Sequence, residues 1–180
     1  MVSRKKIILG VTGSIAAFKA ADIVSRLTQQ GCQVSVVMTK EAEKFITPLT
    51  MQMLSCGKVY CDMFEVQDVW DVEHVSLADS ASLILIAPAT ANIIAKLASG
   101  LCDDLLTCTV AATKAPVLIA PAMNDAMYTH KITQANIERL QKVGYKFVGP
   151  VKGRLACGKV AVGHIADVDE IVRAVLRFLK

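Results

Sequence analysis

Four loops of the sequence carry side chains that could bind and transform a small ligand. Each loop follows a short apolar run of the kind that forms a buried strand. The loops are GVTGSIA at residues 10–16, MTKEA at 38–42, APATAN at 87–92 and APAMNDAM at 120–127. Ligands of open α/β sheets bind beyond the carboxyl ends of the strands. We therefore expect the four loops to meet at one edge of a sheet and to form a binding site there.

The loop at residues 10–16 has the chemistry of a phosphate site. Gly13, Ser14 and Ile15 stand where a strand ends and a helix opens. Free backbone N–H groups and the helix dipole favour an anion at such a point. Thr39, at the end of the next strand, could donate its hydroxyl to the same phosphate. The spacing matches neither a Walker loop nor the full dinucleotide fingerprint, so a plain tight turn and a strand-ending threonine remain equally good interpretations.

The segment APATAN combines small residues with two polar side chains. The small residues Ala87, Pro88 and Ala89 would let the backbone approach a flat ring closely. Thr90 and Asn92 could then hydrogen-bond the polar edge of that ring. A simple N-cap on the following helix explains Thr90 just as well.

APAMNDAM repeats this arrangement one strand later. Ala122, Met123 and Met127 flank Asn124, just past the strand end that Pro121 imposes. Methionine in a loop can merely fill a gap. Asn124, however, is placed to bind a carboxylate or an amide.

His74 and Cys157 are two further candidates. His74 lies in the polar stretch DVEHVSLAD, where the plain interpretation is a surface histidine before a helix. Cys108 sits in an apolar helical pattern that is typical of packing. Cys157 instead lies in a glycine-flanked loop, residues 153–163, where a thiol would be mobile and accessible. A loop that can fold over a site would suit it.

Strands and helices alternate along the whole chain. Apolar runs predict strands at 5–11, 33–39, 82–88, 115–122 and 146–150, and helical spacing predicts helices at 15–30, 40–56, 89–100, 103–113, 129–144 and 166–180. The helical stretch 40–56 is interrupted near Pro48, and Asp167 should cap the last helix. Residues 57–80 show no clear period, and roughly 150–165 should form a loop. The pattern predicts one domain over residues 1–180, a doubly wound α/β fold whose mostly parallel sheet is sandwiched by helices.

Composition narrows the class of protein. Of 180 residues, 53% are hydrophobic and 20% charged, with mean hydropathy +0.45, which suits a full core and favours self-association. The net charge of +4 is scattered, so no nucleic-acid face is expected. Six cysteines and three histidines lack ligand spacing, so we expect no metal site. We recognise no signal peptide or membrane-spanning run, and expect a cytoplasmic protein with free thiols.

These motifs resemble those of the flavin-containing cysteine decarboxylase family. The family's P-A-S-A-N-T is matched by residues 88–93, and its P-x-M-N-x-x-M-W by residues 121–128. An H-x-S-L context surrounds His74, the A-C-G of the family's substrate-covering flap surrounds Cys157, and GLCDDLLT at 100–107 is also similar. Three positions that bear on substrate positioning depart from the family pattern: Ile93 replaces a threonine, Tyr128 a tryptophan, and His164 an arginine.

The resemblance implies a Rossmann-like flavoprotein fold, FMN as cofactor, and decarboxylation of phosphopantothenoylcysteine to phosphopantetheine in coenzyme A synthesis. Loss of CO₂ from a cysteinyl carboxylate needs an electron sink, which oxidation of the CH₂–SH group by FMN would create. By the same resemblance, Gly13, Ser14, Ile15 and Thr39 would hold the FMN phosphate. Residues 87–92 would lie along the isoalloxazine ring.

The resemblance also implies roles at the reacting atoms. His74 would act as base or electrostatic partner in the oxidation. Asn124 would hold the substrate carboxylate and amide beside Ala122 and Met123, and Met127 would pack near the reacting cysteine. Cys157 would donate the proton that accompanies return of the hydride.

Oligomers and alternatives follow from the same resemblance. The family forms trimers, some assembled into dodecamers, with the histidine reaching a neighbour's flavin, and a separate synthetase is a possible partner. One alternative is an oxidative peptidyl-cysteine decarboxylase, against which Cys157 argues. A flavin prenyltransferase is disfavoured by the P-x-M-N-x-x-M segment. A non-catalytic flavin-binding regulatory subunit is the third alternative.

Overall fold

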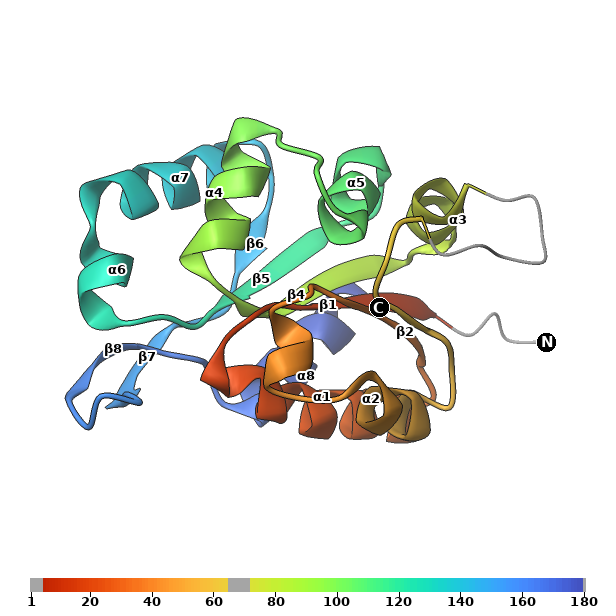
Figure 1. Ribbon diagram of the computed structural model, residues 1–180, viewed down its shortest axis with the longest axis horizontal. Helices are drawn as coiled ribbons and strands as arrows, with labels where there is room; N and C mark the ends of the chain where they lie inside the picture. Colours follow the sequence, from red (N-terminus) through yellow and green to blue (C-terminus); the bar gives the residue numbers. More distant parts are fainter. Residues whose placement is uncertain (1–4, 65–71, 180) are drawn as a thin grey trace.

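A six-stranded parallel sheet forms the centre of the computed structural model, which describes residues 5–64 and 72–179 (Figure 1). The strands lie in the order β3-β2-β1-β4-β5-β6, and every neighbouring pair is parallel. Their bounds are β1 Lys6–Val11, β2 Gln33–Met38, β3 Val59–Tyr60, β4 Leu83–Ala89, β5 Val117–Pro121 and β6 Lys146–Phe147. All residues of β4 and β5 are buried, as expected for strands covered on both faces. The predicted doubly wound α/β fold is confirmed.

Helices cover both faces of the sheet (Figure 1). One face carries α1 Phe18–Gln29, α2 Pro48–Ser55 and α8 Val168–Phe178; the other carries α3 Glu73–Ser80, α4 Ala91–Ser99, α5 Leu105–Ala112 and α7 Lys131–Lys142. The alternation of strand side chains divides the core between these layers. Ile7 and Leu9 pack with α1 and α8, whereas Ile8 between them packs with the helices of the opposite face.

The strand order reverses between β1 and β4, which is where ligands bind in doubly wound sheets. Thr12, only 2% exposed, connects the two loops that leave these strands. Its hydroxyl donates to the Pro88 carbonyl at 2.7 Å and accepts from the Thr90 N–H at 3.2 Å. The two loops are therefore held in a fixed relation at the carboxyl edge of the sheet.

The structure corrects several sequence predictions. Residues 57–80, which show no clear period in the sequence, contain β3 and α3 in their described part. The expected loop at 150–165 is an antiparallel hairpin of β7 Val151–Arg154 and β8 Val160–His164. A short helix, α6 Asp125–Thr129, follows β5. Asp167 does precede α8, but its side chain makes no capping hydrogen bond.

None of the helices in the described residues is long and apolar enough to cross a membrane.

Candidate functional site

A cavity of about 640 Å³ opens at the carboxyl edge of the sheet. Three segments that are far apart in the sequence line it: the loop after β1, the loop after β5 and the hairpin β7–β8. Its volume falls in the range of small-molecule sites, roughly 300–1,000 Å³. Of the predicted site residues, the cavity brings together Ser14, Ile15, Ala122, Met123, Asn124 and Cys157.

The loop after β1 offers backbone donors to an anion. It turns into a single 3₁₀ turn, η1 Ile15–Ala17, which Ser14 caps by accepting from the Ala16 N–H at 3.3 Å. The N–H groups of Gly13 and Ile15 have no acceptor within the described part of the chain. Glycine is required beside them, because a Cβ at Gly13 would lie 2.4 Å from the Cβ of Glu41. The loop thus presents unpaired donors at the start of helical backbone, which fits a phosphate group.

Asn124 stands at the cavity with its amide nitrogen available. It is the N-cap of α6, and its Oδ1 accepts from the Ala126 N–H at 2.9 Å. Its amide nitrogen makes no hydrogen bond within the residues that the structure describes. An amide fixed through its oxygen can still donate two N–H bonds, so Asn124 is suited to hold a carboxylate.

The hairpin β7–β8 carries Cys157 at its exposed tip. The tip closes through two backbone hydrogen bonds of 2.8 Å, from the Leu155 N–H to the Lys159 carbonyl and from the Gly158 N–H to the Leu155 carbonyl. Gly158 has φ +86°, a conformation that favours glycine. The thiol is therefore presented on a tight turn that also lines the cavity.

Known proteins are similar to this chain over its whole length. A flavoprotein family model matches residues 1–180. The chain belongs to the flavoprotein family. It is 46% identical to a probable phosphopantothenoylcysteine decarboxylase of Streptococcus mutans, over 95% of this chain and 97% of that protein. It is also 46% identical to the Bacillus subtilis coenzyme A biosynthesis bifunctional protein CoaBC, over 96% of this chain but only 43% of that longer protein.

Solved structures agree with these relatives. A cysteine-to-serine variant of PPC decarboxylase, complexed with pantothenoylaminoethenethiol, matches this flavoprotein with a TM-score of 0.86 and 30% identity, covering 98% of both chains. The FMN-dependent cysteine decarboxylase SpaF matches with a TM-score of 0.84 and 30% identity, covering 100% of both. The predicted membership of the flavin-containing cysteine decarboxylases is confirmed.

His74 lies away from the cavity in this flavoprotein. The sequence placed it before a helix, but it is the second residue of α3. Helix α3 and the hairpin β7–β8 lie at opposite ends of the molecule's longest axis (Figure 1). A single chain therefore does not bring His74 and Cys157 to one site.

Other predicted residues also lie outside the cavity lining. Thr39 lines a separate 250 Å³ cavity, and its Oγ1 accepts from the Ala42 N–H at 3.3 Å. Thr90 caps α4 by accepting from the Ile93 N–H, which is the plainer of its two interpretations. Ala87, Pro88 and Ala89 are buried within β4. Asn92 on α4 and Met127 on α6 are exposed to solvent.

Sequence reasoning missed two cations of the cavity, Lys19 and Arg154. Neither has a carboxylate partner within the described part of the chain. Lys19 could have been found, because it lies four residues, about one helical turn, after Ile15 of the phosphate-like loop GVTGSIA. The sequence around Arg154 carries no such signal, because it is the folding of the hairpin β7–β8 that brings Arg154 to the cavity. Both charges would attract an anionic ligand.

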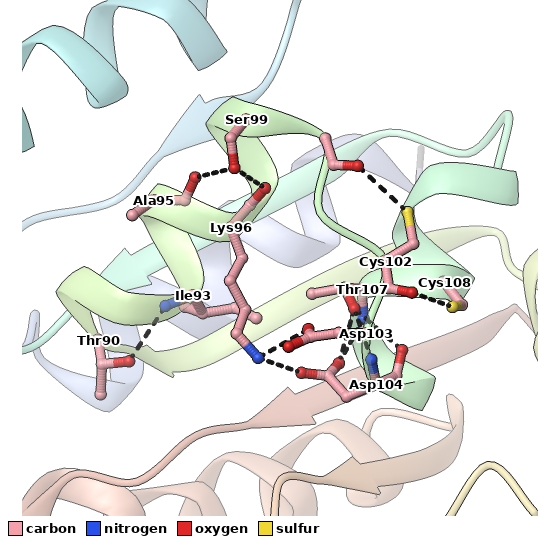
Figure 2. Close-up of polar contacts among 11 residues, drawn as sticks. Thr90, Ile93, Ala95, Lys96, Ser99, Cys102, Asp103, Asp104, Thr107 and Cys108 are labelled. Atoms are coloured by element: carbon pink, nitrogen blue, oxygen red, sulfur yellow. Dashed lines mark hydrogen bonds and ion pairs between the residues drawn. The ribbon is translucent and has the colours of Figure 1, made fainter.

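A polar cluster fixes the GLCDDLLT segment (Figure 2). Asp104 and Thr107 form a capping box at the start of α5, with the Thr107 N–H donating to Asp104 Oδ1 at 2.8 Å. Lys96 Nζ reaches Asp103 at 2.8 Å and Asp104 at 3.0 Å. Burial raises the pKa of Asp104, but the hydrogen bonds from Thr107 and Lys96 outweigh it, and the net pKa is lowered.

Asp104→Ala should lower the free energy of unfolding by about 1–2 kcal/mol at neutral pH, the usual loss for a deleted N-cap. The pKa of Asp104 is lower in the folded state, so its contribution is complete above its unfolded pKa. That contribution disappears as the pH falls through the folded pKa. We therefore expect urea unfolding to show a smaller difference in the free energy of unfolding between wild type and variant at acidic pH than at neutral pH.

Asp103→Ala is the matched control, because Asp103 pairs with the same Lys96 but caps no helix. Its side chain is 47% exposed, and we expect a loss below about 1 kcal/mol. Equal losses in the two variants at neutral pH would show that the cap contributes nothing.

Proposed function

We propose that this flavoprotein binds FMN and decarboxylates phosphopantothenoylcysteine to phosphopantetheine. The observation that carries the proposal is the cavity itself, which joins anion-binding backbone donors, a free amide and an accessible thiol. The Streptococcus mutans relative, which is 46% identical to this chain and is covered over 97% of its length, is named for this activity. The chain spans 43% of the bifunctional CoaBC protein, and we propose a phosphopantothenoylcysteine synthetase as its partner.

The residues present fit FMN. The N–H groups of Gly13 and Ile15, the Ser14 hydroxyl and the Lys19 ammonium would hold its phosphate, and apolar side chains such as Met123 would flank its ring. Bound FMN supplies a reversible two-electron oxidation of the substrate's CH₂–SH group, which creates the electron sink for loss of CO₂. Thr39, which lines the second cavity, and residues 87–92 at the carboxyl end of β4 would also contact the cofactor, as the family resemblance implies.

Asn124 and Cys157 would act on the substrate. The Asn124 amide would donate to the substrate's carboxylate and orient it, and the carboxylate would be released as CO₂. Cys157 would then supply the proton that, together with the hydride returned from the cofactor, regenerates the saturated thiol, so that the overall reaction is redox-neutral. An ethenethiol has two hydrogens fewer than an ethanethiol, so the ligand named for the PPC decarboxylase variant has the oxidation state expected before this last step.

A second copy of the chain would supply His74. Helix α3 is remote from the cavity of its own chain, so His74 can serve as base or electrostatic partner only in a neighbour's site (Figure 1). We propose a trimer, in which each site lies between two subunits. Exposed apolar side chains support self-association, among them Phe18 at 61%, Leu49 at 66% and Met53 at 70%. We place the assembly in the cytoplasm, where its thiols stay reduced.

The mass of the product decides between this function and its nearest rival. Purified protein, supplemented with FMN, is incubated with phosphopantothenoylcysteine, and the product is analysed by mass spectrometry. We expect a loss equal to the mass of CO₂. A loss equal to CO₂ plus two hydrogen atoms would identify an oxidative decarboxylase instead. Protein that is yellow but leaves the substrate unchanged would identify a regulatory subunit.

A further inference from the structure

Lys159 ties the tip of the hairpin β7–β8 to helix α6. Its ammonium forms an ion pair with Asp125, the first residue of α6. Lys159 is 60% exposed and Asp125 only 19%, so the flexible partner comes from the hairpin and the fixed partner from the helix. The two residues lie 34 positions apart in the sequence. The pair therefore links the hairpin to the helix that directly follows Asn124 of the cavity lining.

The hairpin has a second attachment at its base. The Met123 N–H donates to the Gly163 carbonyl at 3.0 Å. The two backbones approach so closely that a Cβ at Gly163 would lie 2.3 Å from the Met123 carbonyl oxygen. This attachment uses backbone only, and it fixes the end of β8 and not the tip. Within the described residues, the ion pair between Lys159 and Asp125 is the side-chain contact that attaches the tip to α6.

Electrostatics around Lys159 agree with this geometry. The hydrogen bond and charge of Lys159 lower the pKa of Asp125. In return, Asp125 raises the pKa of Lys159, and Cys157 adds a smaller contribution of the same sign. Lys159 and Cys157 lie two residues apart on the same hairpin tip. A thiolate left after Cys157 has donated its proton would find a positive charge beside it.

We propose that Lys159 is a positioning residue, which fastens the tip of the hairpin to α6 through Asp125 and thereby holds the Cys157 thiol at the cavity. An exposed ion pair is weak, so the fastening opens and closes readily. Such a reversible attachment suits a flap that must admit the substrate and then present an acid to it. The role assigned to Cys157 rests on the proposed function, whereas the fastening of the hairpin does not.

Hydrogen exchange tests the fastening without any turnover. In Lys159→Met, we expect amides of the segment 155–163 to exchange roughly two- to fivefold faster than in the wild type, as loss of one exposed ion pair permits. Asp125→Asn should have the same effect, and the double variant should be no faster than either single variant. Lys159→Arg should restore the wild-type rate. High salt should narrow the difference between wild type and Lys159→Met.

Lys152→Met is the matched control, because Lys152 lies on the same hairpin, is exposed and has no carboxylate partner within the described residues. It should exchange like the wild type. If Lys159→Met exchanges no faster than this control, or if the effects of Lys159→Met and Asp125→Asn simply add, the fastening is wrong.

Product analysis then tests the consequence for Cys157. With phosphopantothenoylcysteine as substrate, Lys159→Met should release at least about twice the wild-type fraction of product that lacks two further hydrogens, because the proton donor is held less well. An unchanged fraction together with faster exchange would refute the link to Cys157 while leaving the fastening intact. No reaction in the wild type would refute the proposed function and not the fastening.

Discussion

Replacing Cys157 with serine should stop the reaction after CO₂ is lost. The product should then lack the mass of CO₂ plus two hydrogen atoms, and formation of phosphopantetheine should fall by roughly 10²–10⁴-fold, the usual contribution of an acid–base group. The physical reason is acidity, since a thiol donates a proton far more readily than a serine hydroxyl. Mass spectrometry of the product gives the fraction stopped at each stage.

Cys102→Ser serves as the control for this experiment. Cys102 is also an exposed free thiol, but it precedes α5 and does not line the cavity. Its replacement should leave the product distribution unchanged. Unaltered formation of phosphopantetheine by Cys157→Ser would remove the proton-donor role from Cys157.

Mixing two variants that each form little phosphopantetheine should restore its formation if the site is shared between copies. His74→Asn keeps Cys157, and Cys157→Ser keeps His74. Trimers that contain both variants would have some sites with an intact residue from each neighbour. In randomly mixed trimers about a quarter of all sites should be complete, so activity should recover to about a quarter of the wild-type value, far above that of either variant alone.

The matched control mixes Cys157→Ser with Asn124→Asp. Asn124 and Cys157 line the same cavity of one chain, so neither copy can supply what the other lacks. Aspartate preserves the N-cap of α6 but repels a substrate carboxylate. This mixture should stay inactive. Equal behaviour of the two mixtures, whether both active or both inactive, would contradict a site built from Cys157 of one chain and His74 of its neighbour.

The central strands β1, β2, β4 and β5 were predictable because burial on both faces leaves a continuous apolar run. Leu83–Ala89 is such a run, and every residue of it is buried. Helix α3 is only eight residues long and buries Leu77 and Ala78 alone, too little for a periodic signal. The hairpin was missed because Gly153, Gly158 and Gly163 interrupt it. Its strands pair with each other and not with the sheet, so they lack the apolar pattern of the core.

The candidate site was predictable in its chemistry but only partly in its geometry. Ser14, Asn124 and Cys157 meet at one cavity, although 143 positions separate the first from the last in the printed sequence. Thr39 also follows a strand, yet its hydroxyl turns to the Ala42 N–H and it faces a different cavity. The order of the strands in the sheet and the direction of each side chain decide which loop residues line the same cavity. Neither can be inferred from the spacing of residues along the chain.

The most direct test of the central claim follows the colour of the bound cofactor during one turnover. Wild-type protein loaded with FMN is mixed with phosphopantothenoylcysteine without oxygen, while the visible flavin absorption and CO₂ release are recorded together. We expect the absorption to bleach as CO₂ is released and then to recover fully as phosphopantetheine forms. Release of CO₂ with no transient bleaching would contradict the central claim.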